Sequence, residues 1–412
     1  MTGPLAHSVR AMEGRDPDDE HRVATSLELL FDLTFVIAFS VAGSEFAHLI
    51  AEGHYRSGLI GFGFAIFAVV WAWINFTWFA SAYDTDDWIY RLTTMVQMAG
   101  VVILSLGLPA MFDSLDAGDR LDNRAMVVGY VVMRVPMVSQ WMRAGRQDPS
   151  RRRICKVYVI TITVSQIGWI LLLLVDVKAT TTLLLALPLV LLELSGPFVA
   201  EHMDGGTPWH PHHIAERYGL LAIIALGEVL LGTVASLGAV IDVEGWTLDV
   251  ALIVLGGVGL TFGMWWIYFL LPAGEVLHHR RDRSFVWGYG HVFVYAAIAA
   301  VGAGLHVAAL YLEHHASIDA TAVMLSIAIP VAVYFASLAL LFGSLIGGLR
   351  SHTTWVTLAK LGIVVLSVVL AAAGVDLAVC ILVIALAPVV SVVVEETGGR
   401  ERRADAVSEV IG

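Results

Sequence analysis

The chain is poor in cysteine and in charge. Of its 412 residues, two are cysteine and 15% are charged, whereas 58% are hydrophobic. Cys155 and Cys380 lie far apart in the sequence, so neither a disulfide framework nor a thiolate metal site is expected. Soluble domains carry roughly 25% charged residues. The composition therefore excludes an ordinary soluble domain and indicates an integral membrane protein.

Several sequence motifs are also missing. The chain contains no Walker A motif, no Gly-x-Ser-x-Gly elbow, no His-Glu-x-x-His helix and no full Asp-rich prenyl-phosphate motif. Because the Walker A motif is among those missing, an ATP-driven activity would have to obtain its ATP from another subunit. The first 25 residues include no apolar stretch of signal-peptide length. The first span is therefore expected to serve as an uncleaved insertion signal.

Long apolar runs dominate the rest of the sequence. A helix needs about 20 such residues to cross the hydrocarbon core of a bilayer. The runs predict an all-α, polytopic helix bundle with a very tight turn at Ala373-Gly374. The twelve expected spans lie near 27–49, 57–79, 91–112, 124–143, 155–175, 180–200, 217–240, 249–271, 286–311, 321–347, 354–373 and 376–394.

Basic residues predict the orientation of these spans, because Lys and Arg collect on the cytoplasmic side. With twelve spans, three basic segments fall on the same side of the membrane. They hold Arg143, Arg146, Arg151, Arg152, Arg153 and Lys156; Arg280, Arg281 and Arg283; and Arg400, Arg402 and Arg403. We therefore expect a multi-pass protein of the inner (plasma) membrane with both termini in the cytoplasm.

The two halves of the chain share weak similarities. Span two resembles span eight, with Leu59-Ile60 and Gly63 matching Leu252-Ile253 and Gly256. This pattern predicts a tandem repeat of two six-helix halves. The expected organisation is a polar tail at 1–25, a first half at 26–200, a cytoplasmic connector at 201–216, a second half at 217–395 and a polar tail at 396–412.

Glu28 and Asp32 open the first span. Four residues apart on a helix, their carboxylates lie on one stripe, roughly 40° apart around the axis. An ionisable group inside a bilayer costs about 2.5 to 3.5 kcal/mol even on lenient scales, so it points to function. Alternatively, Glu28 lies in the interface, and Asp32 caps the helix or pairs locally.

Asn75 lies between Trp71 and Trp78 on one face of the second span. A buried amide needs hydrogen bonds that lipid does not offer, so Asn75 is expected to face protein or a wet cavity. The alternative for the two indoles is an aromatic belt at the membrane interface.

An acidic loop follows the second span. Asp84, Asp86 and Asp87 precede Arg91, and the three carboxylates could bind a cation, cap the next helix or latch a gate.

His213, Glu216 and Arg217 lead into the seventh span. The spacing of His213 and Glu216 permits a metal site, but no firm ligand set accompanies them, and we expect no metal. A polar helix entrance with an ion pair is the alternative. Glu228 lies further along the same helix, roughly 17 Å beyond Arg217 and close to the membrane midplane.

Arg134 occupies the middle of the fourth span. Such an arginine must pair or lie in water, and its natural partners are Asp32, Glu193 and Glu228. The alternative is a structural pair that only fixes helix packing. His291 could exchange protons, although a lone histidine in an apolar helix is more often simply hydrogen-bonded.

Four stretches resemble the bacterial low temperature requirement protein A family. They are Leu27 to Val36, the Trp-rich second span with Asn75, Asp84-Thr85-Asp86-Asp87, and His213 to Leu220 leading into Gly227-Glu228. The resemblance covers nearly the whole chain. It implies a multi-helical inner-membrane protein whose family name derives from growth at low temperature. It implies neither a substrate nor catalytic roles for any residue.

These features favour a proton-coupled secondary transporter or permease of unknown substrate. The alternatives are an intramembrane enzyme acting on a lipid or prenyl-phosphate, and a non-catalytic membrane scaffold or stress sensor. Catalysis is the less favoured outcome, and we expect no cofactor. The expected partners are the lipid bilayer, protons and a small molecule or ion, but no nucleic acid. The candidate residues for substrate or proton coupling are Glu28, Asp32, Asn75, Asp84, Asp87, Arg91, Arg134, Glu193, His213, Glu216, Arg217, Glu228 and His291.

Overall fold

The computed structural model describes residues 9–17, 19, 22–348 and 351–411. Over these ranges the chain is helical and contains no strand, which confirms the all-α prediction. Residues 1–8, 18, 20 and 21 of the expected N-terminal tail lie outside the described residues.

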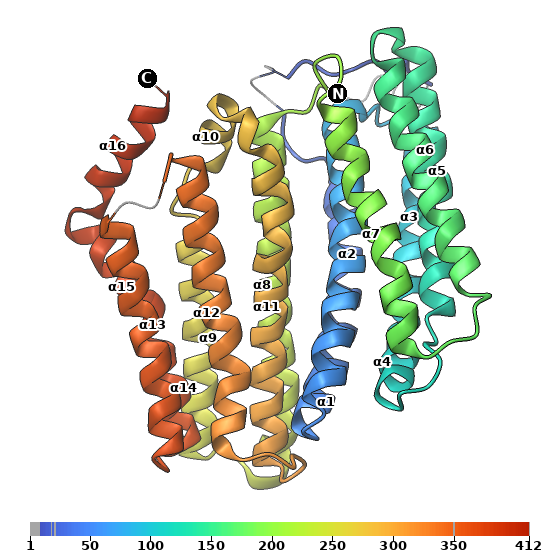
Figure 1. Cartoon of the computed structure of the whole chain (residues 1–412). Helices are drawn as coiled ribbons and strands as arrows, with labels where there is room; N and C mark the ends of the chain where they lie inside the picture. The colour runs from blue at the N-terminus through green and yellow to red at the C-terminus, as the bar shows by residue number, and fades with distance from the viewer. Residues whose placement is uncertain (1–8, 18, 20–21, 349–350, 412) are drawn as a thin grey trace. The chain divides into compact units, whose positions relative to one another are not determined.

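Helices cover all twelve expected spans (Figure 1). In the described residues, eleven helical segments are long and apolar enough to cross a membrane. The expected span at 217–240 lies within α8. The helices are α1 (Ser26–Ala51), α2 (Tyr55–Tyr83), α3 (Trp88–Leu106), α4 (Leu108–Asp116), α5 (Arg124–Gln147), α6 (Arg152–Leu172), α7 (Ala179–Glu201), α8 (Pro211–Glu244), α9 (Leu248–Tyr268), α10 (Ala273–His279), α11 (Ser284–Leu312), α12 (Ala320–Leu345), α13 (Ser351–Ala372), α14 (Leu377–Ile384), α15 (Ala387–Val394) and α16 (Arg400–Ile411).

Glycine explains two local features of the helices. The turn between α13 and α14 is as tight as expected, and Gly374 adopts a φ of 81° there. Gly100 of α3 and Gly129 of α5 face each other, since a Cβ on Gly129 would lie 2.5 Å from the Leu104 nitrogen and 2.6 Å from the Gly100 carbonyl oxygen. Small residues at this crossing therefore let the two backbones approach closely.

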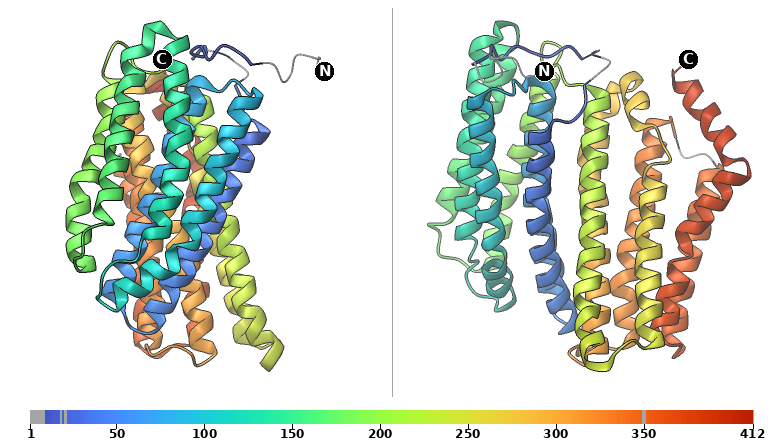
Figure 2. Two further views of the ribbon diagram at one scale, coloured as in Figure 1. Left: turned by 90° about the vertical axis from the view of Figure 1, so that its right-hand side faces the viewer. Right: turned by 180° about the vertical axis from the view of Figure 1, so that it is seen from behind.

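The chain divides into two compact units. Unit 1 comprises Met1–Val41 and Ala68–Arg217, and unit 2 comprises Ala42–Phe67 and Tyr218–Gly412. In unit 1, α5 packs against α3 and α6, and α6 packs against α7. In unit 2, α12 packs against α11 and α13, while α9 packs against α14 and α15. Figure 2 shows these helices from two further sides.

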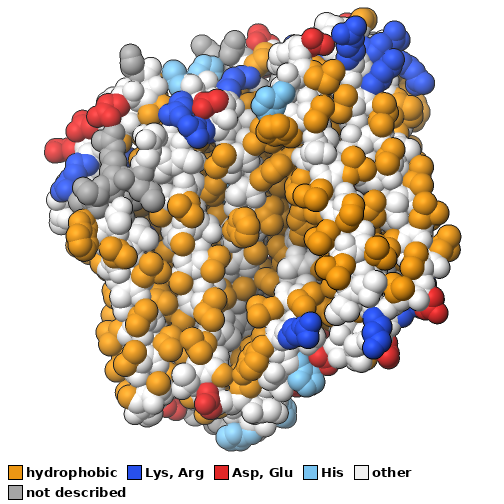
Figure 3. All heavy atoms as spheres, in the orientation of Figure 1, with side chains coloured by type: hydrophobic (Ala, Val, Ile, Leu, Met, Phe, Trp, Pro, Cys, Tyr) orange, Lys and Arg blue, Asp and Glu red, His pale blue; other side chains and the backbone are white. Residues whose placement is uncertain are grey.

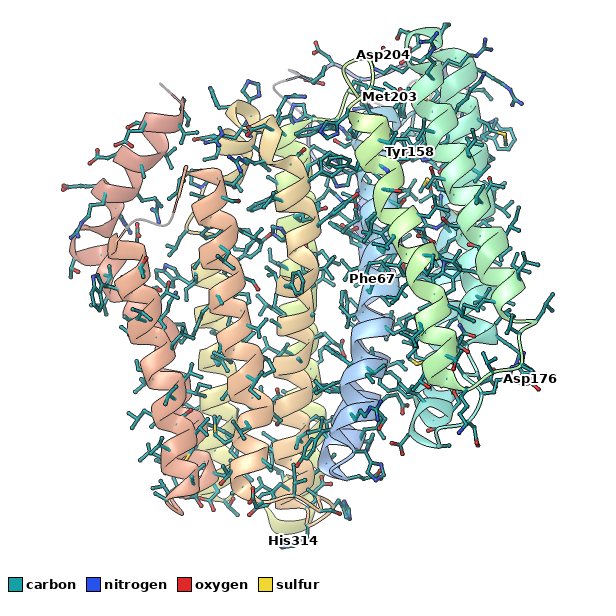
Figure 4. The ribbon with its side chains drawn as sticks, in the orientation of Figure 1. Phe67, Tyr158, Asp176, Met203, Asp204 and His314 are labelled. Atoms are coloured by element: carbon teal, nitrogen blue, oxygen red, sulfur yellow. The ribbon has the colours of Figure 1, made fainter. Side chains whose placement is uncertain are left out.

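The end of α7 is anchored by a hydrogen bond within unit 1. The Tyr158 hydroxyl of α6 donates to Glu201 at 2.8 Å. Figure 4 shows Tyr158 near the loop that carries Met203 and Asp204, whereas Asp176 lies at the opposite end of α7. The contact thus ties α6 to α7 just before the segment that leads into α8.

Apolar side chains cover the outward faces of many helices. Leu33 is 56% exposed and Leu106 is 75% exposed, although both lie in apolar helices. In Figure 3, hydrophobic side chains cover the middle of the helices on the visible face, and charged side chains gather near their ends. This distribution is the one expected of helices that contact lipid.

Candidate functional site

A buried group of charged residues lies where α1 and α8 begin. We call it the ion cluster; its members are Arg22, Glu28, Asp32, Asp84, His213 and Arg217. All six belong to unit 1. Glu28 and Asp32 are four residues apart on α1, and His213 and Arg217 are four apart on α8. Each helix therefore presents two polar side chains on one stripe.

Arg217 and Asp32 form a two-pronged ion pair. The Arg217 Nε donates to Asp32 Oδ2 at 3.0 Å, and Arg217 Nη2 donates to Asp32 Oδ1 at 2.5 Å. The Trp73 indole of α2 also donates to Asp32 Oδ1, at 2.7 Å. The side chains of Arg217 and Asp32 are both 0% exposed. The planar guanidinium and the indole thus satisfy a carboxylate that has no access to water.

Glu28 both starts α1 and binds cations. Its Oε2 accepts from the Thr25 backbone nitrogen at 2.7 Å, while its own backbone nitrogen donates to the Thr25 hydroxyl at 3.3 Å. This reciprocal pair is a capping box. Its Oε1 lies 3.2 Å from Arg22 Nη2, 3.1 Å from Arg217 Nη1 and 3.1 Å from His213 Nε2. Glu28 therefore caps α1 and at the same time pairs with the cations of the buried ion cluster.

Asp84 is the third carboxylate of the ion cluster. It lies in the loop after α2, 3.7 Å from Arg22 Nη2, and its Oδ1 accepts from the Asp86 backbone nitrogen at 2.7 Å. In the described part of the chain, its Oδ2 has no hydrogen-bond partner. Burial and the nearby negative charge of Glu28 raise the pKa of Asp84 to about 6, against the opposing effect of Arg22 and Arg15.

The charges of the ion cluster do not balance without a proton. Its two arginines face three carboxylates, so these six residues carry one surplus negative charge when every carboxyl is ionised and His213 is neutral. The half-buried Arg15, whose Nε donates to the Asp84 carbonyl at 3.0 Å from outside the cluster, offsets part of this charge. A proton on Asp84 or on His213 removes that surplus. His213 Nδ1 has no hydrogen-bond partner among the described residues. Because unpaired charge is costly in a buried site, a proton at one of these two groups would stabilise the cluster.

Asp87 and Arg91 serve local roles beside the ion cluster. Asp87 caps α3 by accepting from the Tyr90 backbone nitrogen at 2.9 Å, which confirms one of the expected alternatives. It also pairs with Arg143, and although burial opposes ionisation, the bonds from Arg143 and the backbone lower the pKa of Asp87 to about 2. Arg91 pairs with Asp86 at 2.7 Å, and both side chains are partly exposed.

A second buried pair joins α5 to α7 in unit 1. Arg134 Nη2 lies 3.0 Å from Glu193 Oε2, so the structure selects Glu193 among the three expected partners. Two indoles also donate to Glu193, from Trp71 at 2.5 Å and from Trp169 at 3.0 Å. The Arg134 guanidinium lies 5.1 Å from the centroid of the Tyr130 ring. With its groups satisfied, this pair fits the packing interpretation.

Two further candidates make bonds to the backbone. The Asn75 amide donates to the Trp71 carbonyl of its own helix at 2.7 Å, and its side chain is half-buried. Glu216 accepts from the Ala24 backbone nitrogen at 3.0 Å and so holds the segment that enters α1.

Unit 2 contains the remaining two candidates. His291 is buried; with a proton on Nδ1 it donates to the Trp287 carbonyl at 2.7 Å, and Nε2 accepts from the Tyr268 hydroxyl at 3.0 Å. Both ring nitrogens are thus engaged, as the hydrogen-bonded alternative predicts. Glu228 of α8 is half-buried, and it is not without an interaction partner.

Arg22 and Trp73 were not among the candidates from the sequence. Arg22 lies in a polar segment with no helical periodicity, so nothing links it to Glu28 before folding. Trp73 lies on a different face of α2 from Trp71 and Asn75, although it belongs to the same aromatic run. Over the described ranges, no group of three or more His, Cys, Asp or Glu side chains is arranged to hold a metal ion.

The helices and the ion cluster define a class: a multi-pass, α-helical integral membrane protein with ionised side chains buried between helices. The sequence profile described as bacterial low temperature requirement A protein (LtrA) matches residues 23–394. The chain belongs to this family, which confirms the resemblance. It is also similar to a protein of Rhizobium meliloti (strain 1021) described as uncharacterized, with 26% identity over 307 residues, or 70% of each chain. No solved structure gives a significant match.

Proposed function

We propose that the protein is a proton-coupled secondary transporter of the inner (plasma) membrane, with both termini in the cytoplasm. Its cargo is a small molecule or ion, and the coupling proton binds at the ion cluster. The observation that carries this proposal is the surplus carboxylate in a buried network that contains His213. A purely structural ion network needs balanced charge, whereas a coupling site needs a group that gains and loses a proton.

The coupling step follows from the contacts of Arg22 and Glu28. When Asp84 is ionised, it competes with Glu28 for Arg22, because Arg22 Nη2 lies 3.7 Å from Asp84 and 3.2 Å from Glu28. Protonation of Asp84 removes this competition and shifts Arg22 toward Glu28. Glu28 starts α1 and also contacts the first turns of α8 through His213. The proton thereby biases the position of the two helix starts, which is the kind of two-state element that alternating access requires.

Untargeted uptake into proteoliposomes tests the transport function. Vesicles with the protein are incubated in a bacterial metabolite extract under a pH gradient of either sign, and their contents are identified by mass spectrometry. We expect one or more solutes to accumulate only while the gradient lasts. Asp32→Asn and Asp84→Asn should abolish the dependence on the gradient. Asp122→Asn should preserve it, because Asp122 pairs with Arg124 in a solvent-exposed site.

The same experiment separates the competing functions. If the contents match those of protein-free vesicles under both gradients, the protein is a scaffold or sensor and the transport proposal is wrong. If solutes or lipids are chemically altered without any gradient, the protein is an enzyme.

A further inference from the structure

A pocket with a volume of about 440 Å³ lies within unit 2. Its walls come from α9, α12 and α13, and residues of α15 and α16 close one side; these helices can be followed in Figure 1. The α12 wall is apolar and includes Phe335, Leu338 and Phe342. Its size falls in the range of about 300 to 1,000 Å³ that small-molecule sites occupy.

Lys360 of α13 lines this pocket and is only 6% exposed. Its ammonium lies 4.7 Å from the centroid of the Phe335 ring. Among the described residues, Lys360 has no carboxylate within ion-pair distance. A lysine held midway along a membrane-spanning helix normally pairs with an anion or reaches water, so this cation requires a partner.

The other charges of the pocket lie on or before α16. Arg403 is already paired with Glu395 at 2.7 Å. Arg402 donates to the Gly398 carbonyl at 3.3 Å and is exposed, as are Asp405 and Glu409. Water screens these exposed groups. Glu395 is also buried but is paired with Arg403, so among the described residues the buried charge of the pocket without an ion-pair partner is the ammonium of Lys360.

We propose that this pocket binds an anionic amphiphile, whose carboxylate or phosphate pairs with Lys360 while its acyl chain lies along the apolar wall of α12. The neighbouring Phe335 ring contributes a cation–π contact to the ammonium and an apolar surface to the chain. A free fatty acid and an anionic phospholipid share this chemistry. The pocket lies wholly in unit 2, and its ligand does not depend on the proposed proton coupling.

Native mass spectrometry of the delipidated protein in detergent tests the proposal. The probes are oleate, oleyl alcohol, dioleoyl phosphatidylglycerol and dioleoyl phosphatidylcholine. The wild type should bind at least one anionic probe, one per chain, about tenfold or more tightly than its neutral counterpart. Lys360→Gln should remove that preference, and Lys360→Arg should retain it. The matched control Lys156→Gln alters an exposed lysine and should have no effect.

The pattern of binding identifies the source of the ligand. Selective binding of oleate supports a free fatty acid, and selective binding of phosphatidylglycerol supports a phospholipid. Equal binding of charged and neutral probes by the wild type would overturn the proposal, as would an anionic preference that survives Lys360→Gln. The headgroup comparison uses the wild type, so it holds even where a variant fails to fold.

Discussion

Removal of Arg217 should be far more costly than removal of an exposed arginine. In Arg217→Met, Asp32 keeps the bond from Trp73 but loses its two-pronged partner, and Glu28 loses one of its cations. Both carboxylates are 0% exposed. Breaking a buried ion pair by removing one partner costs about 3 to 5 kcal/mol, because the remaining charge stays desolvated. We expect a loss of that size in the free energy of unfolding.

The measurement is equilibrium unfolding with sodium dodecyl sulfate in mixed micelles, followed by tryptophan fluorescence. Arg124→Met is the matched control: Arg124 pairs with Asp122 at 2.9 Å, but its side chain is 75% exposed. Such a pair contributes about 0 to 1 kcal/mol. Adding Asp32→Asn to Arg217→Met should recover part of the loss, since it removes the orphaned charge. If Arg217→Met costs no more than Arg124→Met, water reaches the ion cluster and the expected penalty for a buried unpaired charge is wrong.

Three further predictions concern Asp84 of the ion cluster, the helix cap Asp87 and the close contact between α3 and α5. Asp84 has its pKa raised from 3.8 to about 6, so its stabilising effect is complete below pH 3.8 and is lost as pH rises through 6. Unfolding free energies of Asp84→Asn, measured across this window, should lack that fall. A pH profile equal to that of the wild type would exclude Asp84 as the titrating group. Asp87 has a pKa of about 2, so its stabilisation is lost as pH falls from 3.8 through 2. Asp87→Ala should cost about 0.5 to 2 kcal/mol at neutral pH for the lost cap, and a neutral result would contradict the capping role. Gly129→Ala places a Cβ 2.5 Å from the Leu104 nitrogen and should cost about 1 to 3 kcal/mol in the same unfolding assay. Gly63→Ala, with no atom within 4 Å, is its control, and equal costs would refute the close contact.

The sequence predicts the spans well because lipid imposes a simple rule. Each helix must be long and apolar, and both properties can be counted along the chain. The boundaries of α1 and α5 accordingly fall close to the expected runs. The tandem repeat and the orientation of the termini stay predictions, since matching apolar residues and basic loops do not by themselves establish them.

The site is only partly readable from the sequence. The spacing of Glu28 and Asp32 identifies one stripe of α1, and a midplane arginine limits the partners of Arg134 to a few acids. Local spacing cannot determine that Asp32 pairs with Arg217, because the two residues lie in helices far apart along the chain. Arg22 gives no periodic signal at all. Lys360 is visible in the sequence as a single cation within an apolar span, but only the pocket indicates what it could bind.

The central claim is that the ion cluster holds an exchangeable proton. The most direct test is infrared difference spectroscopy of the protein in lipid, titrated across neutral and mildly acidic pH. We expect a carboxylic-acid band that titrates near pH 6 and disappears in Asp84→Asn. It should persist in Asp122→Asn. A spectrum with no titrating carboxyl band, or a band unchanged in Asp84→Asn, would contradict the claim.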